Sequence, residues 1–479
     1  MTRAAFIAFL PVVITAATPL VLLLVALFRR SRATGPWVAA LGAAAALLSL
    51  WPAAACAPAR VTSLMIVDAY ALFFGALVLA ATFAVALLSH SYLKQLAGTH
   101  EEFYVVLMTA ALGSLVLASS DHFVSFILGL ELLTVSLYVM IAYLRGSVGS
   151  LEAGVKYLIL AAVSSAFLLF GMALIYEVFG TLQFGEIARL ASGAPAGGQV
   201  LLLAGTALMV VGLGFKLAVV PFHMWTPDVY QGAAAPVAAF VATASKGAVM
   251  AFLVRFFQEA GLDASGSLSL VFALIAAGSM FAGNILALLQ SNLKRLLAYS
   301  SIAHFGYILV AFVAGGGRAL EAIAFYLVVY TVATLAVFGV IALLAREGVE
   351  PDSVDDYRGL FWERPWIAGV MSAALLSLAG IPLTAGFIGK YLVVAAGIAQ
   401  AHWTLVLILV VNSALGLYYY LRVIVAMMST PPAEPVIRQR LEVSGWVVLL
   451  GLGVALIALG VYPGPMLEII RSALSGALL

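Results

Sequence analysis

Apolar residues fill most of this chain in runs of about 20 residues, and short polar segments separate the runs. An α-helix needs about 20 apolar residues to cross the hydrocarbon core of a bilayer. The short alternating strands of an outer-membrane barrel do not occur in the pattern. It therefore predicts an all-α polytopic membrane protein with about fourteen spans, near 4–28, 36–58, 68–89, 102–119, 123–143, 151–176, 199–225, 233–257, 266–289, 293–313, 319–345, 365–396, 402–427 and 442–462.

Two polar segments between the predicted spans have a distinct character. Residues 177–198 (EVFGTLQFGEIARLASGAPAGG) contain a polar helical stretch that we expect to lie along the surface, and residues 346–364 (REGVEPDSVDDYRGLFWER) form the most charged loop, outside the bilayer. The first apolar run is too long for the core of a signal peptide. We therefore expect it to be retained as the first span.

Basic residues are more frequent in the loops after odd-numbered spans, among them Arg29, Lys94, Lys294, Arg295 and Arg438. Loops rich in lysine and arginine remain in the cytoplasm or its equivalent. The bias predicts that both termini lie on the non-cytoplasmic side of the membrane.

Two apolar segments are overlong and interrupted, GLGFKLAVVPFHMWTPDVY around Pro221 and SLAGIPLTAGFIGKYL around Pro382. Proline leaves a backbone carbonyl without its donor, which is tolerated in a membrane only beside protein or a water-filled cavity. Broken helices at corresponding places in two halves are typical of inverted-repeat transporters. We therefore predict two five-helix repeats at 101–258 and 259–430, after an N-terminal three-helix region at 1–100 and before a C-terminal helix and tail at 431–479.

Composition agrees with the membrane class, since 65% of the residues are hydrophobic, 9% are charged and the mean hydropathy is +1.15. The formal net charge of +2 says little about partners, and we expect no nucleic acid among them. Cys56 is the only cysteine, so the chain cannot form an internal disulfide or a cysteine-held metal or iron–sulfur centre. No glycine-rich nucleotide motif occurs. Energy must therefore come from an ion gradient or from a partner subunit.

Four of the six lysines lie inside the apolar runs, at Lys156, Lys216, Lys246 and Lys390, and Glu131 is the one carboxylate in such a place. A charged group at the centre of a helix costs at least about 2.5–3.5 kcal/mol on insertion scales, so five of them indicate a function. A buried lysine can release its proton, whereas arginine cannot. The alternative is that the charges pair only to lock helices together, although one carboxylate cannot neutralise four ammonium groups.

Lys216 is the best partner for Glu131, because a carboxylate keeps an ammonium charged and its withdrawal lowers the pKa of the lysine. Lys246 lies among small residues, in AAFVATASKGAVMAFLV, which either leave room for water or serve helix packing. Lys390 follows the second break and suits an exit site that faces water. These properties together favour a proton relay.

Three further residues have both a structural and a functional interpretation. Lys156 has Glu152 four positions earlier, which is the spacing of an ordinary ion pair on a helix surface. His304 has serines nearby and either shuttles protons or is a satisfied core histidine. His223 adjoins the Pro221 break and either joins the relay or caps the broken helix.

Several segments resemble one known family. They are FKLAVVPFHMWTPDVYQGAAAPVAAFVATASK (215–246), EAGVKYLILAAVSSAFLLFG (152–171), NLKRLLAYSSIAHFGYILVA (292–311) and FILGLELLTVSLYVMIAY (126–143). Together they resemble subunit N of respiratory NADH-quinone oxidoreductase, complex I, an antiporter-like membrane subunit. The stretch PFHMWTPDVYQG resembles subunit N more than its paralogues L and M.

The resemblance implies fourteen helices, two inverted five-helix repeats and a polar axis along the middle of the membrane. It implies that Glu131 and Lys216 are the paired input site, Lys246 the central relay, and His304 the link towards Lys390. Quinone reduction elsewhere in the complex would drive proton translocation. FMN, iron–sulfur clusters and quinone are expected in partner subunits, with no cofactor in this chain.

The partners that the resemblance implies are other membrane-arm subunits, including paralogous antiporter-like subunits, together with lipids of the bacterial inner membrane. The nearest alternative is a subunit of a multisubunit cation/proton antiporter or of a membrane-bound hydrogenase. Two alternatives of another kind are a structural scaffold subunit and a secondary transporter for an organic solute. The lack of polar clusters beyond the charged axis disfavours the transporter.

Overall fold

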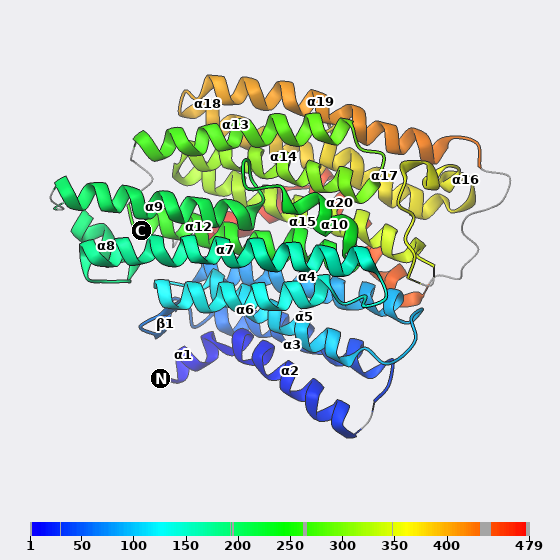
Figure 1. The fold of residues 1–479 in the computed structure, drawn as a ribbon, viewed down its shortest axis with the longest axis horizontal. Coiled ribbons are helices and arrows are strands. Elements are labelled where there is room, and N and C mark those ends of the chain that lie inside the picture. The colour runs from blue at the N-terminus through cyan, green and yellow to red at the C-terminus, as the bar shows by residue number, and fades with distance from the viewer. Residues whose placement is uncertain are drawn as a thin grey trace.

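Long helices that run side by side make up almost the whole molecule (Figure 1). The computed structural model describes residues 2–28, 30–191, 193, 196–261, 266–346, 348–431 and 442–475. In these ranges, 13 helices are long and apolar enough to cross a membrane, and two shorter apolar helices form one further, broken span. The all-α membrane class and the number of spans predicted from the sequence are thus confirmed. Arg29 and Arg438 lie outside the described residues.

The first half of the chain contains a short hairpin of two strands besides its helices. Its elements are α1 (Arg3–Ala8), α2 (Leu10–Phe28), α3 (Thr34–Ala54), β1 (Ala59–Thr62), β2 (Met65–Val67), α4 (Ala69–Leu93), α5 (Glu101–Ala118), α6 (Phe123–Ile141), α7 (Val148–Phe179), α8 (Phe184–Ala191), α9 (Ala196–Leu217), α10 (Trp225–Gly232), α11 (Ala235–Phe240), the π-helical η1 (Val241–Ser245) and α12 (Lys246–Glu259). The strands β1 and β2 pair antiparallel.

The second half is helical throughout its described elements. These are α13 (Gly266–Leu288), α14 (Leu293–Ala314), α15 (Gly316–Leu344), the 3₁₀-helical η2 (Val354–Tyr357), α16 (Leu360–Glu363), α17 (Pro365–Ala379), α18 (Ala385–Ala399), α19 (Trp403–Met428), α20 (Val443–Val461) and α21 (Gly464–Ser475). The polar stretch expected within 177–198 contains α8, and the charged loop 346–364 contains η2 and α16.

Polar residues at the ends of the helices satisfy backbone groups that the helices leave unpaired. The Asp68 carboxylate accepts from the Ala71 N–H before α4, and the Asn292 side chain accepts from the Arg295 N–H before α14. These are N-caps, which satisfy donors that have no partner within the helix. N-capping side chains therefore mark the starts of these two membrane helices.

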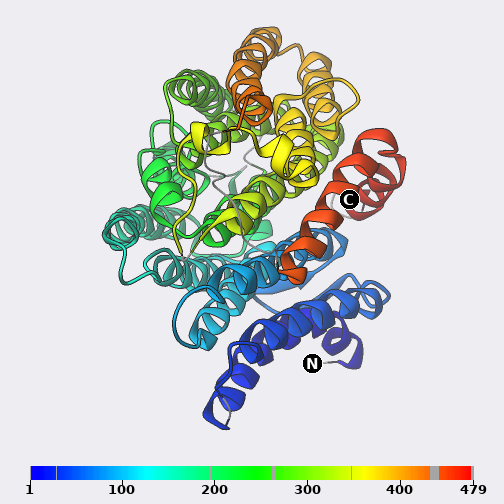
Figure 2. The ribbon, with the colours of Figure 1, turned by 90° about the vertical axis from the view of Figure 1, so that its right-hand side faces the viewer.

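The three most enclosed spans form the centre of the bundle. The span Ala235–Glu259 is 100% buried over its most apolar window, and Gly316–Leu344 and Leu293–Ala314 follow at 94% and 83%. The peripheral span Leu10–Phe28 is only 28% buried. Figure 2 views the bundle end on, with the N-terminal helices at one edge and the C-terminal helices along one flank. Lys246 and His304 are thus carried by the central helices.

Both marked chain ends lie at the same end of the bundle, and α16 lies at the opposite end (Figure 1). An even number of spans requires this arrangement. It agrees with the prediction that the termini share one side of the membrane, but it does not identify that side.

Helix breaks occur near Pro221 and Pro382, as the sequence predicts. The first separates α9 from α10, and the second separates α17 from α18. Each contains a non-glycine residue with a left-handed backbone, Ala218 with φ 59° and Leu383 with φ 75°. Such a conformation is costly and persists only where the surroundings impose it. The division of the chain into two repeats remains a prediction.

Candidate functional site

Lys216 contacts α6, the helix that carries Glu131, but the two side chains do not form a hydrogen bond or ion pair with each other. Glu131 lies on α6, and its Oε1 accepts from the Ser165 hydroxyl of α7 at 2.5 Å. Lys216, in the last turn of α9, donates from Nζ to Thr134 Oγ1 at 2.6 Å. Thr134 follows Glu131 by three positions, which places the two on one side of the helix. Lys216 therefore contacts α6 one helical turn away from Glu131, through the hydroxyl group of Thr134.

Lys246 is completely enclosed in the central helix, with an exposed fraction of 0%. Its Nζ donates to Ser301 Oγ of α14 at 2.8 Å, and it follows directly on the π-helical turn η1. A π-helical turn of this kind is often found at functional sites. The same Ser301 oxygen is also 2.7 Å from the hydroxyl of Tyr330 and 3.3 Å from that of Tyr230. Lys246 therefore belongs to a network of hydroxyl groups.

The hydrogen atoms available in this network allow Lys246 to be charged or neutral. A serine hydroxyl has one donor hydrogen and two acceptor positions, so Ser301 must donate to one of its three neighbours. When Lys246 is charged, Ser301 accepts from the ammonium and donates to a tyrosine oxygen. When Lys246 is neutral, Ser301 can donate to its amine. Rotation of hydroxyl groups thus accommodates either state without moving the backbone.

His304 is held on both sides of its ring. Its Nδ1 is 2.8 Å from the Tyr326 hydroxyl and its Nε2 is 2.9 Å from the Tyr420 hydroxyl. Tyr420 in turn forms a very short hydrogen bond with Ser300. A neutral imidazole donates from one nitrogen and accepts at the other, so it can pass a proton between two hydroxyl groups. The histidine is satisfied by its partners, and these partners are themselves able to exchange protons.

Lys390 lies in the second turn of α18, and its side chain reaches back to the second helix break. Its Nζ donates to the carbonyl of Ala379, the last residue of α17, at 2.7 Å and to Ser413 Oγ at 2.8 Å. The carbonyls of the last turn of a helix have no partner within the helix, so the lysine supplies one. The helix ends at Gly380, whose φ is 80°, and a Cβ there would be 2.7 Å from the Lys390 Cδ. Glycine is therefore required at position 380, both by the left-handed backbone and by the lack of space for a Cβ.

Lys390 also lines a cavity of about 350 Å³ between α17, α18 and α19. The ring centroid of Tyr307 on α14 is 5.1 Å from the Lys390 Nζ. The same ring is 5.6 Å from the ring of His304, and its hydroxyl accepts from Asn284 Nδ2 at 2.9 Å. An aromatic ring therefore lies between the histidine and the terminal lysine.

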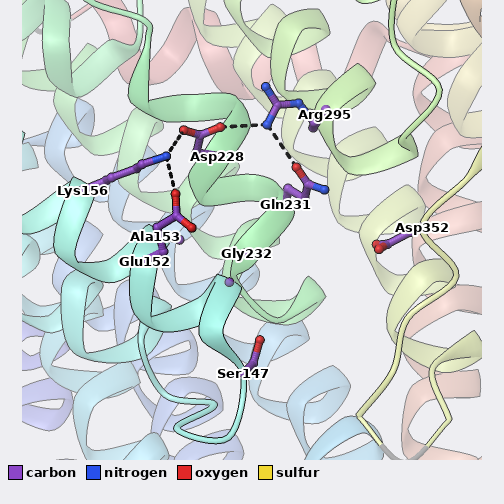
Figure 3. A pocket seen from close by; sticks show the side chains of 10 residues that line it. Ser147, Glu152, Ala153, Lys156, Asp228, Gln231, Gly232, Arg295 and Asp352 are labelled. Atoms are coloured by element: carbon purple, nitrogen blue, oxygen red, sulfur yellow. Dashed lines mark hydrogen bonds and ion pairs between the residues drawn. The ribbon is translucent and has the colours of Figure 1, made fainter.

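Lys156 differs from the other three, because carboxylates surround it. Its Nζ is 2.7 Å from Glu152 and 2.7 Å from Asp228 on α10. Asp228 also pairs with Arg295 of α14 at 2.7 Å, and these residues line an open cavity of about 420 Å³ (Figure 3). The ion pair with Glu152 was predicted from its spacing, whereas the pair with Asp228 was not.

His223 lies in the turn between α9 and α10 and is 8% exposed. Its Nδ1 has no hydrogen-bond partner among the described residues. Its backbone carbonyl accepts from the Thr226 N–H at 3.0 Å, at the start of α10. The residue therefore contributes to the start of α10 through its backbone, and a role of its ring in the relay remains a prediction.

Lys294, one of the basic residues predicted to lie in loops, lies in the first turn of α14 with 4% of its side chain exposed. It forms an ion pair at 2.5 Å with Glu350, whose side chain is 5% exposed. The sequence did not predict this pair, because the two residues are far apart in the chain.

Sequence reasoning missed the polar partners of the relay candidates. They are Thr134, Ser165, Asn284, Tyr307, Tyr326, Tyr330, Ser413 and Tyr420, whereas the serines near His304 were noted. Serine, threonine and tyrosine are common in membrane helices, so their type alone carries no signal. The only available signal was the helical spacing of Ser300, Ser301 and His304 on one segment.

Comparison with known proteins identifies the family to which this chain is similar. Residues 120–416 match the family model described as NADH:quinone oxidoreductase/Mrp antiporter, TM. The chain is 48% identical over 481 residues to NADH-quinone oxidoreductase subunit N of Ectopseudomonas mendocina, covering 98% of this chain and 96% of the relative. It is 47% identical over 472 residues to the subunit N of Methylococcus capsulatus, covering 98% and 95%.

Solved structures give the same relationship. A chain of respiratory complex I from Thermus thermophilus with bound aureothin has a TM-score of 0.82 at 34% identity, covering 96% of this chain and 98% of that chain. A chain of the archaeal membrane-bound sulfane sulfur reductase has a TM-score of 0.87 at 22% identity, covering 99% and 97%, and a chain of the Mrp complex from Dietzia sp. has 0.85 at 19%, covering 100% and 98%. The last two likenesses concern the fold alone.

Proposed function

The chain belongs to the subunit N family of NADH-quinone oxidoreductase, and from this premise we propose that it moves protons through a relay of Glu131, Lys216, Lys246, His304 and Lys390. The coarser conclusion is firm: this is an antiporter-like membrane-arm subunit of a proton-translocating oxidoreductase. Its relationship to this family confirms the resemblance noted in the sequence.

One observation carries the relay proposal. Among the ion pairs of the described residues, none includes Lys216, Lys246 or Lys390. Each of these buried lysines is held by a hydroxyl group, and Lys390 by a backbone carbonyl as well. Burial without a paired carboxylate disfavours a permanent ammonium charge. Such lysines are suited to gain and lose a proton.

The proposed sequence of events begins at Glu131. Charge displaced from partner subunits by quinone reduction changes the electrostatic attraction between Glu131 and Lys216, which are close in space but not paired. A weaker attraction favours release of the lysine proton. The proton then passes to Lys246, whose hydroxyl partners can bind either the charged or the neutral form of the lysine. From there it passes through the tyrosines around His304 towards Lys390.

Two connections in this sequence need water or side-chain motion. No hydrogen bond between described side chains joins Lys216 to Lys246, and the ring of Tyr307 lies between His304 and Lys390. Interruptions of this kind suit a pump, since a continuous path would let protons flow back. Water molecules that enter transiently would complete each step.

The chain's partners are the other membrane-arm subunits, including paralogous antiporter-like ones. We assign FMN, iron–sulfur clusters and quinone to partner subunits and none of them to this chain. The basic loops support placing both termini on the non-cytoplasmic side of the bacterial inner membrane. Identity of 48% to a subunit N favours this assignment over the Mrp antiporter and reductase chains, which share the fold at 19% and 22% identity.

Substitution Lys216→Met tests the relay directly. The variant complex is assembled in membrane vesicles, and the initial rate of proton uptake is measured together with NADH oxidation. We expect far fewer protons to be moved per electron pair, because methionine fills the space but carries no proton. Normal pumping by a normally assembled complex would overturn the relay. A scaffold role predicts a loss of assembled complex with unchanged pumping by the remainder.

A further inference from the structure

The short helix α10 (Trp225–Gly232) lies between the two lysines that begin the proposed relay. Lys216 is in the last turn before the break that precedes α10, and Lys246 is on the helix that follows it. An isolated helix of eight residues has little stability of its own in water. Its place must therefore be set by contacts with the rest of the protein.

The strongest of these contacts are made by Asp228, near the middle of α10. Lys156 of α7 pairs with its Oδ2 at 2.7 Å, and Arg295 of α14 pairs with its Oδ1 at 2.7 Å. Figure 3 shows the two cations approaching the carboxylate from opposite sides. Arg295 also donates to Gln231 Oε1 at 3.0 Å, one turn further along α10. One carboxylate thus ties three helices together.

The first end of α10 is linked to the helix of Lys216. The indole Nε1 of Trp225 donates to the carbonyl of Phe215 at 2.9 Å, and Trp225 is 3% exposed. Phe215 is the residue before Lys216, and Trp225 precedes Asp228 by three positions. A shift of α10 would therefore pull directly on the last turn of α9.

The other end of α10 is linked to the helix of Lys246. Lys294, next to Arg295, donates to the Ala233 carbonyl at 2.9 Å. Its partner Glu350 accepts from the Ala235 N–H at 2.7 Å, at the first residue of the following helix. Two successive basic residues at the start of α14, Lys294 and Arg295, therefore contact the segment after α10 and α10 itself.

We infer that Asp228 is a positioning residue, which together with Lys156 and Arg295 forms a charge clamp that holds α10 so that Lys216 and Lys246 keep their places in the relay. The inference rests on the proposed relay and assigns Lys156 to the clamp. The clamp transmits position and does not carry the proton itself.

The environment of Asp228 supports a fixed charge. Burial raises the pKa of its carboxyl group, but hydrogen bonds from Lys156 and Arg295 outweigh this effect and leave the pKa below its usual value. The carboxylate therefore stays ionised throughout the neutral range, facing two cations and, across the cavity, Glu152 and Asp352. A group that does not change its charge in this range is suited to hold a helix in place.

The clamp is tested in membrane vesicles that contain the assembled complex. Asp228→Asn, Arg295→Gln, Lys156→Gln and the double variant Asp228→Asn/Arg295→Gln are compared for protons moved per NADH oxidised. We expect each single change to lower this ratio by about fivefold, which corresponds to a shift of about 1 kcal/mol in the population of the aligned state. The double variant should be no worse than Asp228→Asn, because both changes break one interaction.

Glu152→Gln is the matched control. It removes the other carboxylate of Lys156, at the same distance of 2.7 Å, but that carboxylate lies on α7 itself and does not reach α10. The ratio should stay normal. Asp228→Glu keeps the charge and should restore pumping in part, with the same pH profile as the unaltered complex.

Three results would overturn the clamp. A defect in Asp228→Asn with normal Arg295→Gln and Lys156→Gln would make Asp228 a proton carrier, as would a shifted pH profile in Asp228→Glu. Less assembled complex with a normal ratio would reduce the residue to an assembly role. Normal pumping in every clamp variant, when Lys216→Met abolishes it, would reject the clamp and leave the relay standing, whereas normal pumping in Lys216→Met would reject the relay first.

Discussion

The six lysines of this chain divide into two sets with different partners. Lys94 and Lys294 lie at ends of helices and Lys156 lies within α7, and all three pair with carboxylates, at distances of 2.5–2.8 Å. The other set is buried within the bundle, where hydroxyl groups and one backbone carbonyl hold Lys216, Lys246 and Lys390. We therefore propose that the group bound to a lysine, more than the position of the lysine in an apolar run, indicates whether its charge is fixed or exchangeable.

The physical reason is the stability of the protonated state. A carboxylate at contact distance favours the ammonium form strongly, so the lysine keeps its proton. A hydroxyl group can donate or accept, so it favours neither state strongly. The buried Arg255 fits the first set, since its guanidinium pairs with Asp68 at 2.7 Å while only 4% of its side chain is exposed. The hydroxyl-held lysines are the ones suited to proton transfer.

The largest expected effect is that of Lys246→Arg. Arginine retains the charge but does not release its proton, so the central step of the relay would stop. We expect proton pumping per electron pair to fall by about a hundredfold, the usual contribution of a positioned proton-transfer group. The measurement is the initial rate of proton uptake by vesicles, corrected for assembled complex. Near-normal pumping would show that charge alone suffices there and would remove the distinction between the two sets.

The next effect concerns the hydroxyl partner of Lys246. Ser301→Ala leaves the lysine and two tyrosines without a common partner, and an unsatisfied buried group costs about 1–3 kcal/mol. We expect pumping to fall severalfold with little change in the amount of complex. Ser114→Ala is the control, because that buried hydroxyl bonds only to the Ala110 carbonyl of its own helix. Equal effects of both changes would contradict a special role of Ser301.

At the second break, Gly380→Ala tests whether the placement of Lys390 depends on the helix end. The new methyl group would meet the Lys390 side chain at a backbone φ of 80°, and strain of this kind costs about 1–3 kcal/mol. We expect a lower thermal unfolding temperature and weaker pumping. Gly369→Ala in the same helix has nothing within 4 Å of the added Cβ and should leave both unchanged.

A small effect is expected at the carboxylate-held lysine nearest to the relay. Lys156→Arg keeps the charge that faces Glu152 and Asp228, and exposed pairs of this kind contribute little. Proton pumping should therefore change by less than about twofold. A loss as large as that of Lys246→Arg would place Lys156 in the relay and not in the clamp.

The smallest effect is a dependence of stability on pH at Asp228. Its pKa in the folded protein is below the usual value of 3.8, so its ion pairs stabilise the fold fully above that value. The contribution is lost as the pH falls through the lowered folded pKa. Thermal unfolding of the complex should thus be more acid-sensitive, below about pH 4, than that of Asp228→Asn. Equal acid sensitivity would show that the clamp contributes little to stability.

Much of the fold could be predicted from residue type and spacing. The apolar runs located the spans to within a few residues, and Pro221 and Pro382 located both breaks. The site was predictable in part, because a lysine in an apolar run is rare enough to be noticed. Its partners were not, since Thr134 and Ser301 are 82 and 55 positions from their lysines. The pairing of Lys294 with Glu350 likewise joins two residues far apart in the chain.

The amino-acid sequence established the membrane class, the number of spans, the two helix breaks and the small set of charged residues inside the bundle. Those properties follow from local physics, because hydrophobic length and proline act within one segment. The tertiary structure decided which lysines face a carboxylate and which face a hydroxyl group. That choice depends on contacts between helices far apart in the chain, and our proposal of a fixed charge at Lys156 and an exchangeable one at Lys246 rests on it.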